Sequence, residues 1–241
     1  MGGQIVPPSS QLALAVQLSD EETFTCFFGE KNTEVLEQLS TFIYGNEQTQ
    51  EQPTSTYLFG ASGSGKTHLL HASCTYAEQK GLSSLCLSFS DLTEFSVDVL
   101  DGLESIDVIC LDDIQYIAED EEWQREVFDL YNRVSEQNKR LIIAGNKDIQ
   151  SLGITLPDLV SRLSWGYVVQ PKMLDDNEKL LVLQYRARQR GIFLSDDVAK
   201  YLLNHLSREM KSLIISLDTL DKASIIAQRK ITIPFIKETL L

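Results

Sequence analysis

The sequence is poor in basic residues. Lys and Arg number 21 among 241 residues, against 35 Asp and Glu, so the formal net charge is −14. A protein that binds nucleic acid along its backbone neutralises phosphates with Lys and Arg. The deficit therefore argues against broad, sequence-independent DNA binding, although it describes the whole chain rather than any single patch.

Cysteine is scarce as well, and long apolar runs are absent. The four residues Cys26, Cys74, Cys86 and Cys110 include no C-x-x-C pair, which excludes a zinc ribbon or a thioredoxin-type site and fits a reducing compartment. No stretch of about 18 apolar residues occurs, and the N-terminus lacks the features of a secretory signal. We therefore expect a cytoplasmic protein with no membrane partner.

The rest of the composition is that of an ordinary globular protein. Hydrophobic residues make up 43% of the chain and charged residues 23%. Its length suits one large domain, or a medium domain followed by a small one. Residues 1–20 are polar and contain Pro7 and Pro8, so we expect a flexible N-terminal arm.

Short apolar strands alternate with helical patterns from residue 34 to residue 170. The strands are predicted at 56–59, 84–88, 107–111, 140–144 and 167–170, and the helices at 34–44, 66–80, 91–100 and 121–138. Unbroken apolar strands between helices are typical of a parallel sheet that is covered on both faces. We predict a five-stranded parallel αβα sandwich over residues 21–171.

After Pro171 the strand patterns stop. Helical patterns follow at 175–190, 195–206 and 208–228, and a short helix is predicted from Pro234. The first of these has an acidic first turn and a basic last turn, which complements the helix dipole. We predict a small all-α subdomain over residues 172–241.

The sharpest motif matches G-x-x-x-x-G-K-[ST], the phosphate-binding P-loop. It comprises Gly60, Ala61, Ser62, Gly63, Ser64, Gly65, Lys66 and Thr67. Glycines let successive N–H groups point at phosphate oxygens, and the following helix presents its positive N-terminal end. Lys66 is expected to reach the β- and γ-phosphates, and the Thr67 hydroxyl to bind Mg²⁺. A strand directly before the motif and a helix directly after it argue against a plain Gly-Ser linker.

A second motif ends the third predicted strand. Four apolar residues from Val108 to Leu111 run into Asp112 and Asp113, which is typical of a Walker B strand whose carboxyl end holds Mg²⁺. Asp112 is the candidate for supporting the metal, and Asp113 for polarising an attacking water. The alternative is a buried strand followed by an acidic turn.

Further residues resemble the bacterial initiator DnaA and its relatives in the AAA+ superfamily. The segment from Asp112 to Gln115 resembles their Walker B, and the box from Glu22 to Asn32, with Phe28 and Gly29, is similar to the one that lies against adenine. The resemblance covers about residues 20–241. It implies the AAA+ fold with a helical lid, and ADP or ATP as cofactor together with Mg²⁺.

The same resemblance assigns roles to three polar residues. Asn146 falls at the position called sensor 1 and Arg208 at sensor 2, where Ser207 precedes it instead of the glycine of DnaA. Arg162, in the segment from Leu156 to Leu163, falls at the arginine finger. Such an arginine would act in trans, on the γ-phosphate bound by the next subunit.

Within this group the chain is most similar to the Hda family, regulatory DnaA homologues without a DNA-binding domain. The chain ends soon after the lid pattern, and its arm contains a peptide similar to the clamp-binding hexapeptide of that family. The contacting residues would be Gln11, Leu12, Leu14 and Val16. Ala15 stands where proline is usual, which raises the ordering cost on binding.

The resemblance implies a nucleotide-bound regulator with weak ATPase activity of its own. Its partners would be DnaA, the DNA polymerase III β sliding clamp and further copies of itself in a homo-oligomer, with DNA reached only through the clamp. The regulator would stimulate hydrolysis of DnaA-bound ATP and so inhibit re-initiation of chromosome replication. Two alternatives stay open, a DnaC-like helicase loader and a stand-alone AAA+ ATPase.

Overall fold

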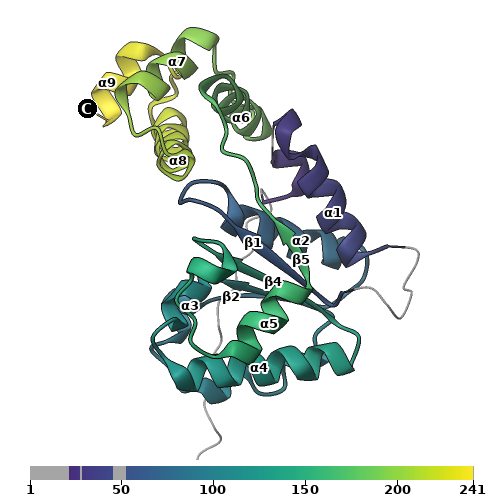
Figure 1. The fold of residues 1–241 in the computed structure, drawn as a ribbon. Helices are drawn as coiled ribbons and strands as arrows, with labels where there is room; N and C mark the ends of the chain where they lie inside the picture. The colour runs from purple at the N-terminus through teal and green to yellow at the C-terminus, as the bar shows by residue number, and fades with distance from the viewer. Residues whose placement is uncertain (1–21, 28, 46–52, 241) are drawn as a thin grey trace, which may run out of the picture.

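The computed structural model describes residues 22–27, 29–45 and 53–240, and contains a five-stranded parallel sheet (Figure 1). The strands are β1 (Ser55–Phe59), β2 (Ser84–Ser88), β3 (Val108–Asp112), β4 (Arg140–Gly145) and β5 (Tyr167–Val169). Their order is β2-β3-β4-β1-β5, and all four pairings are parallel. The predicted αβα sheet is confirmed, and the carboxyl ends of β1, β3 and β4 lie along one edge.

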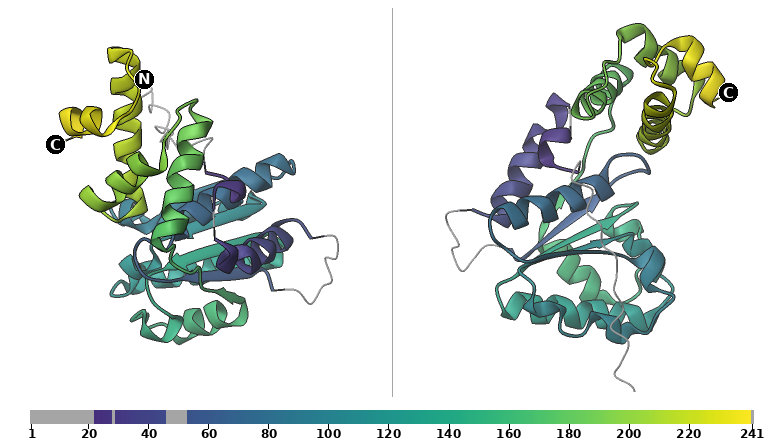
Figure 2. Two further views of the ribbon diagram at one scale, coloured as in Figure 1. Left: turned by 90° about the horizontal axis from the view of Figure 1, so that it is seen from above. Right: turned by 180° about the vertical axis from the view of Figure 1, so that it is seen from behind.

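Helices cover both faces of the sheet (Figures 1 and 2). One face carries α1 (Thr33–Ile43) and α2 (Lys66–Gln79), and the other α3 (Phe89–Leu92), α4 (Glu121–Glu136) and α5 (Pro157–Trp165). Alternate strand residues enter the two cores: Leu58 and Ile142 face α1 and α2, whereas Tyr57 and Ile143 face α4 and α5. Within the described residues, six 3₁₀ turns lie before or between these elements: Phe24–Cys26, Glu30–Asn32, Val97–Leu100, Leu103–Ser105, Ile114–Ile117 and Ile149–Ser151.

The prediction of one helix over residues 91–100 was wrong. The segment instead holds the end of the short α3 and the 3₁₀ turn Val97–Leu100, with a bend between them. Two serines explain the break, because their hydroxyls bond to nearby backbone: Ser88 Oγ accepts from Ser90 N, and Ser96 Oγ accepts from Asp98 N. Each serine therefore starts a separate short turn.

Four helices follow the sheet and share a core of their own. They are α6 (Asp176–Gln189), α7 (Asp196–His205), α8 (Met210–Ala227) and α9 (Ile233–Leu240). Asp175 and Glu178 form a capping box at the start of α6, and Leu202 and Leu217 are fully buried between the helices. The helical lid region predicted after the sheet is confirmed. Pro171, where we place the domain boundary, lies between β5 and α6.

A buried asparagine joins the lid to the rest of the chain. Asn32, just before α1, accepts a hydrogen bond from Lys172 N at 2.7 Å and donates one to Lys172 O at 3.0 Å. Nearby, Lys31 forms a salt bridge with Asp175 at 3.1 Å, at the start of α6. The connection from β5 to α6 is thereby attached to the N-terminal end of α1.

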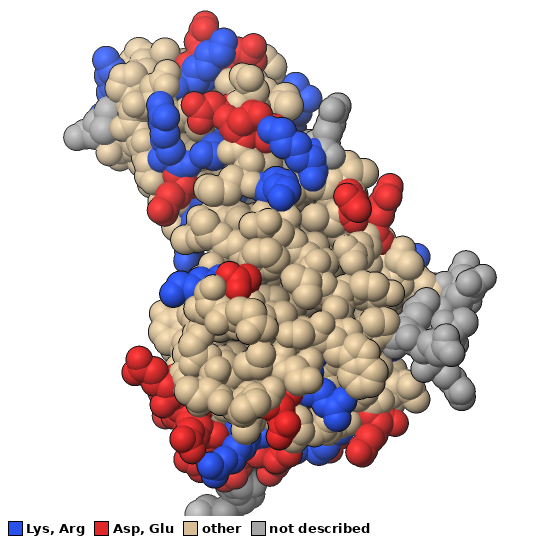
Figure 3. All heavy atoms as spheres, in the orientation of Figure 1, with Lys and Arg blue, Asp and Glu red and all other residues tan. Residues whose placement is uncertain are grey.

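The surface charge differs between the two parts. Acidic side chains are frequent at the lower end of the molecule in Figure 3, whereas Lys and Arg are frequent on the lid at the top. In the sequence, residues 1–171 contain 26 Asp and Glu against nine Lys and Arg, and residues 172–241 contain nine against twelve. Within the described ranges, no helix is both long and apolar enough to cross a membrane.

Candidate functional site

The P-loop connects the end of β1 to the start of α2, as predicted from its motif. Gly63 and Gly65 have φ angles of +80° and +89°, which L side chains rarely adopt. A Cβ atom at Gly65 would also lie 2.5 Å from Cε2 of Phe27, and one at Gly60 would lie 2.9 Å from Ser64 Oγ. Backbone conformation and close packing therefore both require glycine in this loop.

Lys66 is buried at the first position of α2. Its Nζ donates hydrogen bonds to the carbonyl oxygens of Gly60, at 2.8 Å, and Ala61, at 3.3 Å. Burial lowers the pKa of Lys66, and the carboxylates of Asp112 and Asp113 oppose that shift. The ammonium group thus lies inside the curl of the loop.

Thr67 and Asp112 meet beside the P-loop. Thr67 Oγ1, on α2, donates to Oδ2 of Asp112, the last residue of β3, at 2.5 Å. Burial raises the pKa of Asp112, and the charge of Asp113 adds to the rise, while the bond from Thr67 and the charge of Lys66 oppose it. Mg²⁺ in phosphate sites prefers one or two such oxygens together with phosphate and water. The hydroxyl and carboxylate therefore fit the predicted metal site.

A glutamine that sequence reasoning did not single out connects the other two predicted polar residues. Gln115 Nε2 donates to Asp113 Oδ1 at 2.7 Å, and its Oε1 accepts from Asn146 N at 3.2 Å. Ser88 Oγ also lies 3.4 Å from Asp113 Oδ2. Asp113 itself has a left-handed backbone, with φ of 58°. Gln115 lies in the segment that resembles Walker B, but its contacts depend on the ends of β3 and β4 lying side by side, which the sequence does not show.

The N-terminal box packs on α2 and the P-loop. The ring of Phe27 stacks on His68 with centroids 5.6 Å apart, and His68 Nε2 lies 3.2 Å from Thr23 O. His71 bonds to Glu22. Burial and then the charge of Arg186 lower the pKa of His68 to about 4, whereas the bond that His71 donates to Glu22 raises the pKa of His71.

Gly29 and the neighbouring Phe28 were predicted to belong to the adenine box. Gly29 has a φ of +114°, and a Cβ there would lie 3.0 Å from Oε1 of Glu178 on α6. Phe28 lies outside the described residues. The predicted clamp peptide, with Gln11, Leu12, Leu14 and Val16, lies outside them too.

Two predicted arginines lie away from this cluster. Arg208 is exposed in the turn before α8, where its carbonyl accepts from Lys179 Nζ at 2.9 Å. Arg162 lies on α5, on the sheet face opposite α2. Over the part of the chain that the structure describes, no hydrogen bond or ion pair joins either guanidinium to the P-loop.

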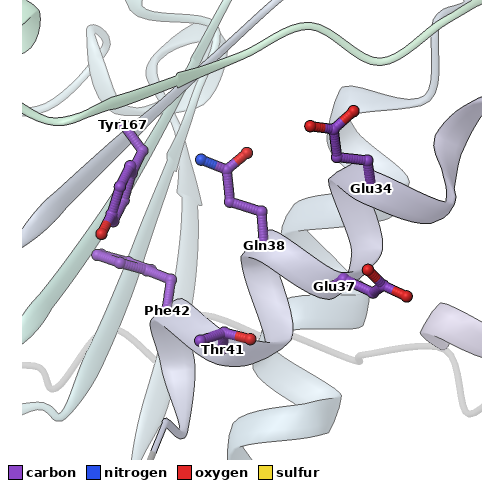
Figure 4. A pocket seen from close by; sticks show the side chains of 6 residues that line it. All are labelled: Glu34, Glu37, Gln38, Thr41, Phe42 and Tyr167. Carbon is purple, nitrogen blue, oxygen red and sulfur yellow. The ribbon is translucent and has the colours of Figure 1, made fainter. Parts of the chain in front are cut away.

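A separate hollow of about 370 Å³ lies between α1 and β5 (Figure 4). It is lined by Glu34, Glu37, Gln38, Thr41, Phe42 and Tyr167. The rings of Phe42 and Tyr167 meet edge to face, at 6.2 Å between centroids. None of its lining residues belongs to the P-loop or its contacts, so we do not assign it to the candidate site.

Known proteins share this fold. DnaA from Aquifex aeolicus bound to AMPPCP is 25% identical, with a TM-score of 0.68 over 86% of this chain and 67% of that one. A replication initiator DnaA bound to AMPPCP and single-stranded DNA is 23% identical, with a TM-score of 0.70 over 88% and 70%. Domain III of DnaA from Thermotoga maritima is 18% identical, with a TM-score of 0.75 over 92% and 96%.

Two family models match consecutive parts of the sequence. The lid domain of Hda matches residues 176–240, and the ATPase domain of bacterial DnaA matches residues 18–170. The resemblance to DnaA and Hda that the motifs indicated is thereby confirmed. With a P-loop, a Walker B strand and an Hda lid in order along it, the chain belongs to the family of bacterial DnaA ATPase domains.

Proposed function

We propose that this protein is a nucleotide-bound regulator that links the DNA polymerase III β sliding clamp to DnaA and stimulates hydrolysis of DnaA-bound ATP. Its product, DnaA bound to ADP, would be inactive in starting another round of replication. The Hda lid behind a DnaA ATPase domain supports the assignment. We place the regulator in the bacterial cytoplasm, in contact with the nucleoid only through the clamp.

The position of Arg162 carries the proposal. Arg162 packs beside Tyr131, whose hydroxyl bonds to Ser55 at the first residue of β1. The P-loop follows the last residue of the same strand. A five-residue strand spans about 17 Å. Arg162 thus lies toward the opposite edge of the sheet from its own P-loop, which supports a finger that acts on a nucleotide in another subunit.

The P-loop fits ADP or ATP with Mg²⁺. Lys66 and the N–H groups of residues 60–67 would hold the phosphates, and Thr67 and Asp112 would hold the metal. The metal would neutralise phosphate charge. Arg208 would approach the phosphates from the lid, and Phe28 and Gly29 would border the base. The AMPPCP bound to the DnaA neighbours supports this assignment.

Hydrolysis by the protein itself would depend on Asp113 and Asn146. Both contact Gln115, which would fix the carboxylate relative to the end of β4. Asp113 is one methylene shorter than a glutamate, so we expect slow turnover. Steady-state ATP hydrolysis by the protein alone separates a regulator from a stand-alone ATPase, because fast turnover would contradict the proposal.

The decisive experiment measures hydrolysis of ATP bound to DnaA, with clamp loaded on DNA. The protein should accelerate this hydrolysis, and Arg162→Ala should remove the acceleration, since an arginine finger contributes about 10³–10⁵ in other phosphoryl-transfer systems. Arg125→Ala is the matched control, because Arg125 lies on the neighbouring α4 and forms an exposed ion pair with Glu121 on the same helix. Loss of nucleotide binding in Arg162→Ala would show a structural role instead.

The clamp contact is tested by deleting residues 1–18. The deletion should abolish binding to the clamp and leave nucleotide affinity unchanged, because the P-loop and lid lie outside it. Substituting Gln11 and Leu14 together by alanine should reproduce the loss. Clamp affinity that survives the deletion would assign the contact to another surface, and a complex with the replicative helicase would favour the DnaC-like loader.

A further inference from the structure

The guanidinium of Arg162 lies within cation–π distance of two aromatic rings. Its central carbon is 5.8 Å from the ring centroid of Tyr131 and 5.7 Å from that of Trp165. Tyr131 belongs to α4, and Trp165 lies three residues after Arg162 on α5, at the spacing that brings helix side chains together. The arginine is therefore held by one ring from its own helix and one from the neighbouring helix.

The two rings differ in how firmly they are held. Tyr131 is 5% exposed, and its hydroxyl hydrogen-bonds to that of Ser55 at 3.0 Å, so its position is set by the core. Trp165 is 73% exposed. Trp165 thus lies next to the arginine, on the outer surface.

Arg162 also forms no ion pair with the acidic residue one turn earlier on its own helix. Asp158 precedes it by four residues, yet no salt bridge or hydrogen bond joins them, whereas Arg125 does bond to Glu121 at the same spacing, at 3.0 Å. Across the described residues, the Arg162 guanidinium makes neither a hydrogen bond nor an ion pair. A guanidinium in contact with aromatic rings alone keeps its N–H donors free to bind oxygen atoms.

We propose that Tyr131 and Trp165 are positioning residues that hold Arg162 ready for a phosphate group presented by another subunit. The inference rests on the proposed function and names two residues that serve the same site. The rings restrict the guanidinium before the partner arrives, so less side-chain entropy is lost on contact. They also leave every donor available, which a salt bridge to Asp158 would not.

Substitution of Trp165 in the full-length protein tests the inference in the DnaA hydrolysis assay. Trp165→Ala should lower the maximal stimulated rate about two- to fivefold, the range that one exposed cation–π contact spans. The concentration of protein that gives half-maximal stimulation should change little. Trp165→Phe should restore most of the rate because it keeps a ring. A change in half-maximal concentration alone, or no rescue by phenylalanine, would overturn the inference.

A second readout needs no partner. In the protein alone, the Nε–H resonance of Arg162 should carry a ring-current shift that Trp165→Ala reduces and Trp165→Phe retains. Tyr131→Phe, which keeps the ring but not the bond to Ser55, should retain it as well. An Arg162 Nε–H chemical shift that does not change in Trp165→Ala would contradict the inference.

The outcomes separate the two proposals. If Arg162→Ala stimulates DnaA as well as the unaltered protein does, the proposed function fails. If Arg162→Ala is inactive but Trp165→Ala is fully active, the proposed function stands and only the positioning role fails. Because Trp165 is largely exposed, we expect both Trp165 variants to fold, and their thermal unfolding provides the check.

Discussion

The α/β body, residues 22–171, and the lid, residues 172–240, differ in charge. The body region of the sequence is strongly acidic, and the lid has a small excess of Lys and Arg. A nucleotide bound at the P-loop would bring its own negative charge to an acidic body. In the body, Lys66 is buried inside the P-loop. In the lid, Arg208 is exposed in the turn before α8.

The two regions also differ in how they are built. The body has two cores, one on each face of the sheet, and the lid has a single core among four helices. Asn32 and Lys31 connect them at residues 170–175, the connection from β5 to α6, which we call the hinge. Cε of Met173 in this hinge would be 3.9 Å from a Cβ on Gly63. The hinge thus passes beside the P-loop. A lid with its own core can change position without unfolding the body.

The largest effect should come from removing core volume in each region. Ile142→Ala in β4 and Leu217→Ala in α8 both truncate fully buried side chains, so each should cost about 2–5 kcal/mol locally. Native-state hydrogen exchange should show Ile142→Ala lowering protection across the sheet and Leu217→Ala lowering it in α6–α9 only.

Ile226→Ala is the matched control, because that side chain is 84% exposed on the same helix as Leu217. It should leave exchange unchanged. If Leu217→Ala lowers protection in β1 and β4 as strongly as in the lid, the body and lid form one cooperative unit, and the comparison between them fails.

Nucleotide affinity should depend more on the body than on the lid. Lys66→Ala removes a buried ammonium that would form charge-assisted bonds, so the Kd for ADP should rise about 100-fold. Arg208→Ala should raise it about tenfold. Calorimetry measures both, with Lys80→Ala, at the other end of α2, as a control that keeps affinity. An equal or larger loss in Arg208→Ala would assign the main phosphate contact to the lid.

The hinge should respond to loss of Asn32. Asn32→Ala leaves the N–H and carbonyl of Lys172 without their present partner, at a cost of about 1–3 kcal/mol. The distance between fluorescent labels on α4 and α8 should also become broader. Lys31→Ala, which breaks an exposed salt bridge, should cost less stability than Asn32→Ala does. Equal effects would mean that the buried amide has no special role.

Local sequence patterns predicted most of the helices and strands, because the periodicity of apolar residues depends on the local backbone conformation. Apolar runs located the strands, helical spacing located the lid helices, and the motif from Gly60 to Thr67 located the phosphate loop. The failure at 91–100 has a local cause too: Ser88 caps the short α3, and Ser96, inside the predicted helix, caps a separate 3₁₀ turn. Serine is ordinary in sequence, so its capping role appears only with the fold.

The contacts that sequence could not predict join distant segments. Gln115 reaches Asn146, 31 residues away, because β3 and β4 are adjacent in the sheet. Tyr131 reaches Arg162 because α4 packs beside α5. Each contact needs the sheet order and helix packing, which spacing along one chain does not contain.

The smallest effect concerns a titrating pair that attaches the N-terminal box to α2. Burial alone would raise the pKa of Glu22, but its bond to His71 and the charges of His71, His68 and Arg186 together outweigh burial and lower that pKa. The same bond raises the pKa of His71 above 6.5. Because the folded pKa of His71 lies above its unfolded value of 6.5 and that of Glu22 lies below its unfolded value of 4.5, the pair contributes fully between about pH 4.5 and 6.5. That contribution is lost as pH rises through the folded pKa of His71, and also as pH falls through the folded pKa of Glu22.

Two-dimensional NMR of the imidazole rings would follow this directly. His71 should titrate above 6.5, and Glu22→Gln should move it downward because the carboxylate partner is gone. His68, one helical turn earlier, should titrate near 4, since burial and the charge of Arg186 disfavour its protonation. If the pKa of His71 is 6.5 or lower, or is unchanged in Glu22→Gln, then the N-terminal box is attached through Phe27 and His68 alone. Its contact with the body should then not vary as His71 titrates.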